Sequence, residues 1–296
     1  MLAPLFRRSE TVIVLILVAG MIVIGLINPA FWSLDNLFSL VRANVIIGIM
    51  ALSVLMVMIS GGIDVSFPAF AAAAMYLTVI AMNHFGYQGV VLPLVGATVI
   101  GLVCGLMNAF FIHTFRMIPL IVTLGTASVV RGLLLGLVGT SIINIDRMPK
   151  SLIAFGRTTV EVGGSALTAM VFVYLGLAIA VWLFLTRTMA GRGIYAYGGD
   201  PESAKRVGFN TRRIVYLVYG LAGALAGFAG LLHASMIWLA NPRDFVGFEL
   251  DVIAAVVLGG ASIFGGRGSV LGTLLGVFML VLIKNSLIIM RVDNTW

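Results

Sequence analysis

Long uncharged runs dominate the sequence and leave few choices for its fold. Nine runs are predicted to form membrane-embedded helices, since a helix of about 20 apolar residues crosses a bilayer. Only 10% of the residues are charged, whereas a soluble domain carries about a quarter. We therefore predict an all-α, polytopic membrane protein with a single transmembrane domain over 1–296. The predicted spans are 11–27, 44–60, 66–82, 90–112, 118–141, 166–186, 213–239, 251–263 and 270–290.

The eighth run, 251–263, is too short to cross a membrane straight. We expect this span to be broken or to continue through the glycine-rich turn that follows it. Lys284 lies deep in the last predicted span, and the sequence offers no partner for its charge.

The basic residues predict which ends of the spans face the cytoplasm. With the N-terminus inside, the 113–116 turn, the 187–213 segment and the turn at Arg267 all lie inside and carry net positive charge. The nearly neutral segments that then lie outside are 28–43, 83–89, 142–165 and 240–250. The overall charge of +7 is thus typical of a membrane protein that marks its cytoplasmic side, and it does not indicate a nucleic-acid partner.

The segment 187–213 is a long polar stretch between two spans, and it contains the signals of a short helix. Six cations and two carboxylates give it a net charge of about +4. Asp200 suits the N-cap, Pro201 the first helical position and Gly208 the left-handed residue after the helix. A helix over 201–207 is too short to persist alone in water, so we expect a partner to hold it through Ala204, Val207 and Phe209. An ordinary solvated loop with one helical turn explains the same residues equally well.

Glycines recur inside the apolar runs. Gly223 and Gly227 form a small-xxx-small pair, which lets two helix backbones pack closely in lipid. Other glycines of this kind are Gly96, Gly101, Gly105, Gly220, Gly230, Gly272 and Gly276. We interpret most of them as helix-packing positions with no role in transport.

Several polar residues fall within or beside the spans, where burial is costly. Asp64 follows the Gly61-Gly62 pair, which interrupts a long apolar run, and Ser66 is expected to cap the next helix. An unpaired charge such as Arg131 costs at least ~2.5 kcal/mol within a span unless it reaches the interface. The residues assigned to a solute path are Asp64, Asn108, Thr123 and Arg131. Structural hydrogen bonding between helices explains these residues equally well.

The sequence lacks the residue patterns of a catalytic or metal site. The three histidines lie in unrelated segments with no cysteine or carboxylate at metal-ligand spacing, so no metal site is predicted. The segment 191–196 fits the G-x-G-x-x-A dinucleotide fingerprint, but it follows a membrane span and not a strand. The glycine-rich segment 265–269 lacks the lysine of a phosphate-binding loop. We therefore predict no enzyme activity and no cofactor in this chain. If ATP drives transport, another polypeptide binds it.

Four segments together resemble the permease subunits of bacterial ABC importers for simple sugars. The segments are ISGGIDVSFP (59–68), IPLIVTLGTASVVRGL (118–133), GRGIYAYGGDPESAKRVGFN (191–210) and FELDVIAAVVLGGASIFGGRGSVLGTLLG (248–276). The resemblance covers nearly the whole chain, with its motifs in the order found in ribose, arabinose, xylose and autoinducer-2 type permeases. These permeases are related in fold to the vitamin B12 importer. The resemblance implies about ten spans, so we expect a final helix after residue 296.

The resemblance also implies partners and a mechanism. The segment 187–213 would be the coupling loop that docks a cytoplasmic ABC ATPase, which binds the ATP. A periplasmic sugar-binding protein would deliver the solute, and a second permease subunit, identical or different, would complete the path. The chain would lie in a bacterial inner membrane with its N-terminus in the cytoplasm. The positions assigned to ATPase coupling are Gly191, Arg192, Gly193, Asp200, Pro201, Ala204, Val207 and Gly208.

Two alternatives come from other functional classes. A secondary transporter or channel would need no ATPase, but an ion-coupled carrier usually buries titratable residues at an ion site, and Asp64 is the only plausible candidate. A membrane-embedded enzyme would need a metal or nucleophile cluster. In a binding-protein-dependent importer specificity rests mostly on the binding protein, so this sequence points to simple sugars as a class.

Overall fold

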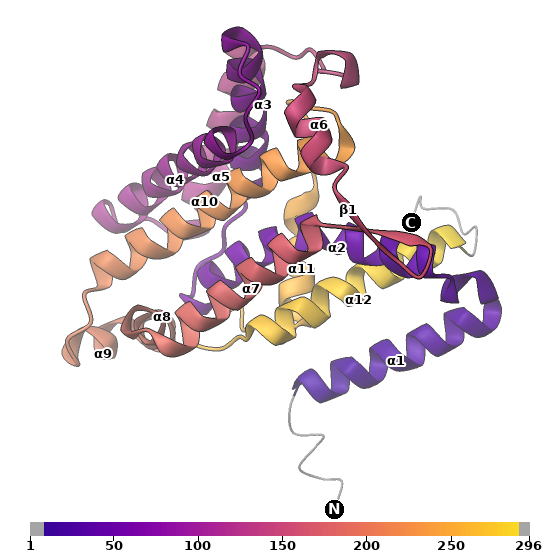
Figure 1. Ribbon diagram of the computed structural model, residues 1–296. Coiled ribbons are helices and arrows are strands. Elements are labelled where there is room, and N and C mark those ends of the chain that lie inside the picture. Colours follow the sequence, from indigo (N-terminus) through magenta and orange to yellow (C-terminus); the bar gives the residue numbers. More distant parts are fainter. Residues whose placement is uncertain (1–8, 290–296) are drawn as a thin grey trace, which may run out of the picture.

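The computed structural model is mainly helical and describes residues 9–289 (Figure 1). Within that range eight helices are long and apolar enough to cross a membrane. They are α1 (Ser9–Ile27), α2 (Leu34–Ile59), α3 (Phe67–Phe85), α4 (Val91–Thr114), α5 (Pro119–Leu133) with its π-helical extension η3 (Leu134–Val138), α7 (Met170–Arg187), α10 (Thr211–Ile237) and α12 (Val270–Ile289). The prediction of an all-α, polytopic membrane protein is confirmed.

The eighth predicted span is short and interrupted, as expected. α11 (Phe248–Leu258) has 11 residues and covers about 16 Å, roughly half of the hydrocarbon core. The non-helical segment 259–269 then leads to α12. The Lys284 ammonium of α12 donates a hydrogen bond to Asp251 of α11, which explains the lysine that the sequence left without a partner.

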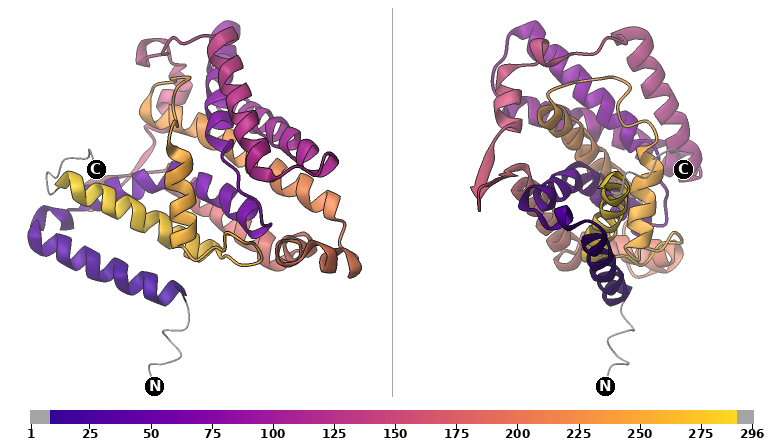
Figure 2. Two further views of the ribbon diagram at one scale, coloured as in Figure 1. Left: turned by 180° about the vertical axis from the view of Figure 1, so that it is seen from behind. Right: turned by 90° about the vertical axis from the view of Figure 1, so that its right-hand side faces the viewer.

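The long helices form two groups that meet along α10. One group contains α3, α4, α5 and α10, and the other contains α1, α2, α7 and α12, as Figures 1 and 2 show. α10 packs along α4 and also against α3 and α2, so it belongs to the contact between the groups. α2 is central, and every residue from 48 to 60 is buried. α1 lies at the edge with most of its apolar side chains exposed, as expected for a helix that faces lipid.

Short elements occupy the connections. They are η2 (Pro29–Trp32), η4 (Ile145–Arg147), α6 (Lys150–Gly156), the antiparallel strands β1 (Thr159–Val162) and β2 (Ser165–Thr168), α8 (Met189–Gly199) and α9 (Pro201–Arg206). The span predicted from residue 166 begins four residues later, at Met170. Apolar residues such as Leu167 belong to the hairpin, so the hydrophobic signal starts before the helix.

The connections gather at two opposite ends, in the sets that the charge pattern predicts. Ile143 pairs with Ala240, and the Asn83 amide donates to the Arg147 carbonyl, so three segments predicted to lie outside meet at one end. The 113–116 turn, the α8–α9 segment and the 259–269 loop meet at the other end, around the cavity described below.

Glycines bring α4 and α10 into backbone contact. A Cβ atom added at Gly101 would lie 2.1 Å from the carbonyl oxygen of Gly223, and one added at Gly105 would lie 2.1 Å from that of Tyr219. From the other side, a Cβ on Gly223 would lie 2.2 Å from the carbonyl oxygen of Gly101. These separations leave no room for a side chain, so the predicted small-residue packing face is confirmed.

Candidate functional site

The short helix α9 begins as the sequence predicts. The Asp200 carboxylate accepts a hydrogen bond from the backbone N–H of Glu202 at 3.1 Å, and Pro201 occupies the first helical position. The Ser203 hydroxyl also donates to this carboxylate, which lowers the pKa of Asp200 and favours the charged, accepting form. The start of α9 is thus fixed by contacts within four consecutive residues.

The end of α9 is a Schellman motif. The backbone N–H of Gly208 donates to the carbonyl of Lys205, and that of Phe209 donates to the carbonyl of Ala204, both at 3.0 Å. Gly208 has a φ of +94°, the left-handed conformation that glycine adopts without strain. The helix ends at Arg206, one residue earlier than predicted, and Val207 forms the C-cap in a non-helical conformation.

Ala204 and Val207, both assigned to ATPase contact, have opposite surroundings. Ala204 is only 2% exposed and is buried within this chain, so the prediction that it touches a partner is corrected. The chain turns back at Gly208, so that the Phe209 N–H donates a hydrogen bond to the Ala204 carbonyl. Val207 is 73% exposed and borders a surface groove of about 400 Å³. Val207 is therefore an exposed apolar side chain at the end of α9, and its contact with a partner stays a prediction.

α8 connects α9 to the end of α7. The Thr188 hydroxyl caps it by accepting from the Gly191 N–H at 3.0 Å. A Cβ atom on Gly191 would lie 2.3 Å from the carbonyl oxygen of Phe184, and Gly193 is also buried within the chain. These two glycines shape the loop, whereas Arg192 is exposed and available to a partner. α8 was not predicted from the sequence, because a glycine-rich segment is a weak helix signal.

Four glycines, Gly61, Gly198, Gly265 and Gly266, form a contact that we call the glycine junction. A Cβ atom on Gly198 of α8 would lie 1.7 Å from the carbonyl oxygen of Ile59, the last residue of α2. A Cβ atom on Gly265 would lie 2.4 Å from the carbonyl oxygen of Gly198. The Gly266 N–H also donates to the Ile59 carbonyl at 2.9 Å. Three segments far apart in the sequence are thus in direct backbone contact.

A tyrosine on α8 strengthens this connection. The Tyr195 hydroxyl donates to the carbonyl of Gly268 at 2.8 Å. Burial raises the pKa of Tyr195, so the hydroxyl keeps its proton and remains a donor at neutral pH. α8 is therefore bound both to the end of α2 and to the 259–269 loop.

The interruption between α2 and α3 is held by Asp64. One oxygen of its carboxylate accepts from the Ser66 backbone N–H at 2.7 Å and from the Ser66 hydroxyl at 2.5 Å. Both residues are buried. Asp64 therefore bonds the backbone at the break. The expectation that the Ser66 side chain caps α3 is wrong, because its hydroxyl donates to Asp64 and makes no bond to the first turn.

Asn108 and Thr123 extend this contact into a buried polar network. The Asn108 amide donates to the Ser66 hydroxyl at 2.8 Å and accepts from the Thr126 hydroxyl at 2.7 Å. The Thr123 hydroxyl donates to the Ile63 carbonyl at 3.3 Å. Three of the four residues assigned to a solute path are thus brought together across α4 and α5. All three are at most 3% exposed, so in this conformation they bond helices to one another.

Arg131 lies apart from the polar network. It is partly exposed in the last turn of α5, and no ion pair or hydrogen bond of its side chain is formed among residues 9–289. Sequence reasoning missed Thr126, which lies three residues after Thr123 on the same helix. A role of these residues in a solute path stays a prediction.

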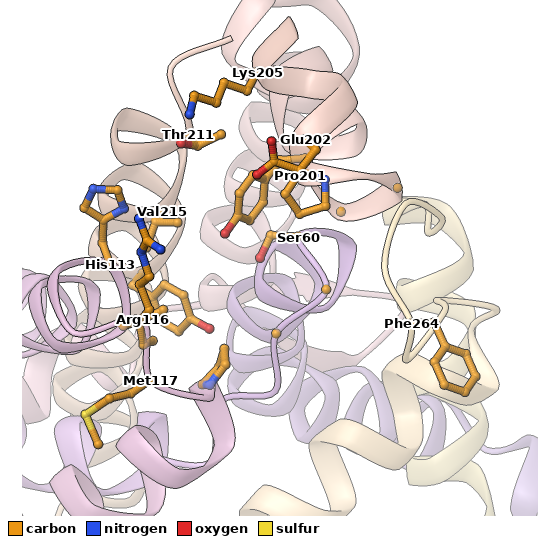
Figure 3. Close-up of a pocket in the computed structure, with 18 residues that line it drawn as sticks. Ser60, His113, Arg116, Met117, Pro201, Glu202, Lys205, Thr211, Val215 and Phe264 are labelled. Atoms are coloured by element: carbon orange, nitrogen blue, oxygen red, sulfur yellow. The ribbon is translucent and has the colours of Figure 1, made fainter.

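A cavity of about 720 Å³ opens at the α8–α9 end of the helices (Figure 3). His113 and Arg116, from the end of α4 and the turn after it, lie along one wall. Lys205 of α9 lies at the upper edge of the view, and Glu202 and Ser60 lie on the opposite side. The cavity is therefore bounded both by the ends of transmembrane helices and by α9.

The wall of this cavity also contains a buried hydroxyl. Tyr219 of α10 is 3% exposed, and its hydroxyl has no hydrogen-bond partner among the residues that the structure describes. A Cβ atom on Gly62 would lie 2.3 Å from that hydroxyl oxygen, so the hydroxyl packs against Gly62 in space that a side chain there would take.

Comparison with known proteins places this arrangement in a family. The family described as "Branched-chain amino acid transport system / permease component" matches residues 36–295. The autoinducer 2 import system permease protein LsrD of Enterobacter sp. (strain 638) is 34% identical over 295 residues, which cover 96% of this chain and 86% of the relative. The ribose import permease protein RbsC of Escherichia coli (strain K12) is 29% identical over 295 residues, which cover 99% and 89%.

No solved structure shows a significant match to the chain. The family match takes in every long helix from α2 to α12, together with α8, α9, the glycine junction and the polar network. The chain therefore belongs to the branched-chain amino acid transport system / permease component family, as a multi-pass transport permease.

Proposed function

We propose that this chain is the transmembrane subunit of an ABC importer and forms the path of a simple sugar or sugar-like solute. A periplasmic binding protein delivers the solute, a cytoplasmic ABC ATPase binds the ATP, and a second permease subunit, identical or different, completes the path. The chain lies in a bacterial inner membrane with its N-terminus in the cytoplasm, and it is not itself an enzyme. The similarity to import permeases over nearly the whole length supports this function.

The structural observation that carries the proposal is the construction of α8 and α9. α9 has six residues, a length that is marginal in isolation, yet it is capped at both ends and fixed to α8. Its cations Lys205 and Arg206 and the side chain of Val207 are exposed at the end of the molecule. A rigid, cationic projection connected to α2 through the glycine junction is suited to receive a push from an ATPase.

A neutral solute fits the polar groups of the helices better than an amino acid does. The buried polar side chains of the network are an amide and hydroxyls, apart from Asp64, whose carboxylate is bonded internally. A zwitterionic amino acid would need partners for two charges inside the membrane, and such partners are expensive to bury. Two of the relatives are named for ribose and autoinducer 2 import, which favours a sugar-like solute over a branched-chain amino acid.

Reconstituted transport tests the proposal directly. The permease, its ATPase and its binding protein are placed in proteoliposomes, and accumulation of labelled ribose, arabinose, xylose and leucine is measured. We expect accumulation of one of the sugars that needs both ATP and the binding protein. Uptake driven by a proton or sodium gradient without the ATPase would contradict the importer assignment, and uptake of leucine alone would contradict the solute class.

The exposed Val207 allows a sharper test of ATPase docking. Val207→Asp places an uncompensated charge in the expected contact, where burial of an unpaired charge is costly. We expect the variant to insert in the membrane, to lose its ATPase in co-purification and to lose uptake. Val246→Asp is the matched control, because Val246 is also exposed (64%) but lies beyond the opposite end of α10. If both variants keep the ATPase equally well, α9 is an ordinary loop helix.

A further inference from the structure

The cavity between α9 and the α4–α5 turn carries Arg116, a charge that the proposed transport function does not use. Its volume, about 720 Å³, lies within the range of small-molecule sites. Arg116 and Lys205 line it from two different elements. Neither cation forms an ion pair within residues 9–289, where the two ion pairs involve other residues. Two unpaired cations that share one cavity favour an anionic ligand.

The position of Arg116 is built into the turn. Arg116 has a φ of +52°, a left-handed conformation that is unfavourable for a non-glycine residue. It follows the C-cap of α4 and lies beside His113 along the same wall (Figure 3). A guanidinium group offers paired N–H donors that match the oxygens of a phosphate.

A second observation indicates hydroxyl groups on the same ligand. The Tyr219 hydroxyl is buried in the cavity wall without a partner, and an unpaired buried hydroxyl is unfavourable. The hydroxyl occupies space that a side chain at position 62 would fill, so glycine at this position allows it to lie there. The Glu202 carboxylate and the Thr211 hydroxyl, which also line the cavity, can accept hydrogen bonds from a polyol.

We propose that this cavity binds a phosphate ester that bears hydroxyl groups, with the phosphate on Arg116 and Lys205 and a hydroxyl on Tyr219. Because Arg116 belongs to the α4–α5 turn and Lys205 to α9, the bound ligand holds α9 against the transmembrane helices. Two sources supply this chemistry at the end of a membrane protein, namely a free phosphorylated polyol and the headgroup of phosphatidylglycerol.

Calorimetric titration of the full-length chain in phosphatidylcholine nanodiscs tests the site. The probe is glycerol 3-phosphate, with inorganic phosphate and glycerol as comparisons. This measurement uses the permease without its ATPase or binding protein, so its result does not depend on the importer assignment. We expect glycerol 3-phosphate to bind more tightly than inorganic phosphate, and glycerol not to bind.

Three variants assign the contacts. Arg116→Gln and Lys205→Gln should each weaken binding of glycerol 3-phosphate at least about tenfold, the usual effect of removing a hydrogen bond to a charged group. Tyr219→Phe should weaken glycerol 3-phosphate about threefold or more and leave inorganic phosphate unchanged. The matched control is Arg243→Gln, since Arg243 is exposed beyond the other end of α10 and should have no effect.

Nanodiscs that contain phosphatidylglycerol distinguish the two sources. If the lipid headgroup occupies the cavity, these nanodiscs abolish binding of the soluble probe. If a free phosphate ester is the ligand, the affinity for glycerol 3-phosphate is the same in both lipids. Failure of glycerol 3-phosphate to bind in phosphatidylcholine overturns the proposal. Unchanged affinity in Arg116→Gln and Lys205→Gln also overturns it, and unchanged affinity in Tyr219→Phe overturns the assignment of a hydroxyl-bearing ester.

Discussion

Asp64 is a buried carboxylate whose hydrogen bonds point to a structural role. It accepts two hydrogen bonds from Ser66 at the break between α2 and α3. Asp64→Asn keeps an oxygen that accepts these bonds, so we expect folding and uptake to be largely retained. Asp64→Leu leaves the buried Ser66 N–H unpaired, which should destabilise the protein by about 1–3 kcal/mol. Thermal unfolding in detergent and uptake with and without a proton gradient measure both effects.

Proton coupling through Asp64 predicts the opposite pattern. A carrier that moves protons on this carboxylate would lose coupled uptake in Asp64→Asn while its thermal stability stayed the same. Ser66→Ala serves as a control, because it removes the hydroxyl that bonds both Asp64 and Asn108 without changing any charge. A gradient-dependent current that disappears only in Asp64→Asn would show that the carboxylate carries the proton.

The local signals around α9 predicted its start and its stop, whereas contacts between distant segments could not be predicted. The positions of Asp200, Pro201 and Gly208 follow from backbone rules that operate within a few residues. The Asn108–Ser66 hydrogen bond joins positions 42 residues apart, and no pattern in either segment predicts contact with the other. The burial of Ala204 could likewise not be predicted from the sequence, because it depends on how the chain turns back after the helix.

At the scale of elements, the contact between α4 and α10 leaves no room for a side chain at its glycines. Gly101→Ala would place its Cβ 2.1 Å from the backbone carbonyl oxygen of Gly223, so one of the helices must move. Overpacking of this kind costs about 1–3 kcal/mol, and we expect a lower melting temperature in detergent. Gly96→Ala on the same helix is the matched control, because a Cβ there has no neighbour within 4 Å. Equal melting temperatures would mean that the two helices are not in the contact described.

The existence of the long helices could be predicted from length and hydropathy alone, because lipid forces the backbone to satisfy its own hydrogen bonds. The short α11 was anticipated for the same reason, as 11 residues cannot cross a bilayer. α8 could not be predicted, because its glycines are weak helix formers, although Gly191 and Gly198 allow close packing on α7 and α2. Most of β2 was included in the predicted span 166–186, since its apolar residues adjoin α7, whereas β1 lies in the segment predicted to be a connection.

At the scale of the whole molecule, a continuous series of contacts leads from α9 into the transmembrane helices. α9 is connected to α8, α8 meets the end of α2 at the glycine junction, and the Tyr195 hydroxyl bonds the 259–269 loop. α2 is the buried centre of one helix group and packs on α10, which runs along α4 in the other. Displacement of α9 would therefore reach both groups through packed backbone and not through a flexible linker.

This series of contacts predicts a variant that separates ATPase docking from transport. Gly198→Ala would place a Cβ 1.7 Å from the carbonyl oxygen of Ile59, so α8 must shift away from the end of α2. The exposed side chains of α9 are unchanged, and we therefore expect the ATPase to co-purify and hydrolyse ATP while uptake per ATP falls at least about tenfold, a coupling loss of roughly 1.4 kcal/mol. Gly199→Ala, one residue further on, is the control, because a Cβ there meets nothing within 4 Å.

If Gly198→Ala transports at the rate of Gly199→Ala, the push from the ATPase does not pass through the glycine junction. If Gly198→Ala instead loses the ATPase, this contact determines the shape of the docking surface and not the transmission of movement.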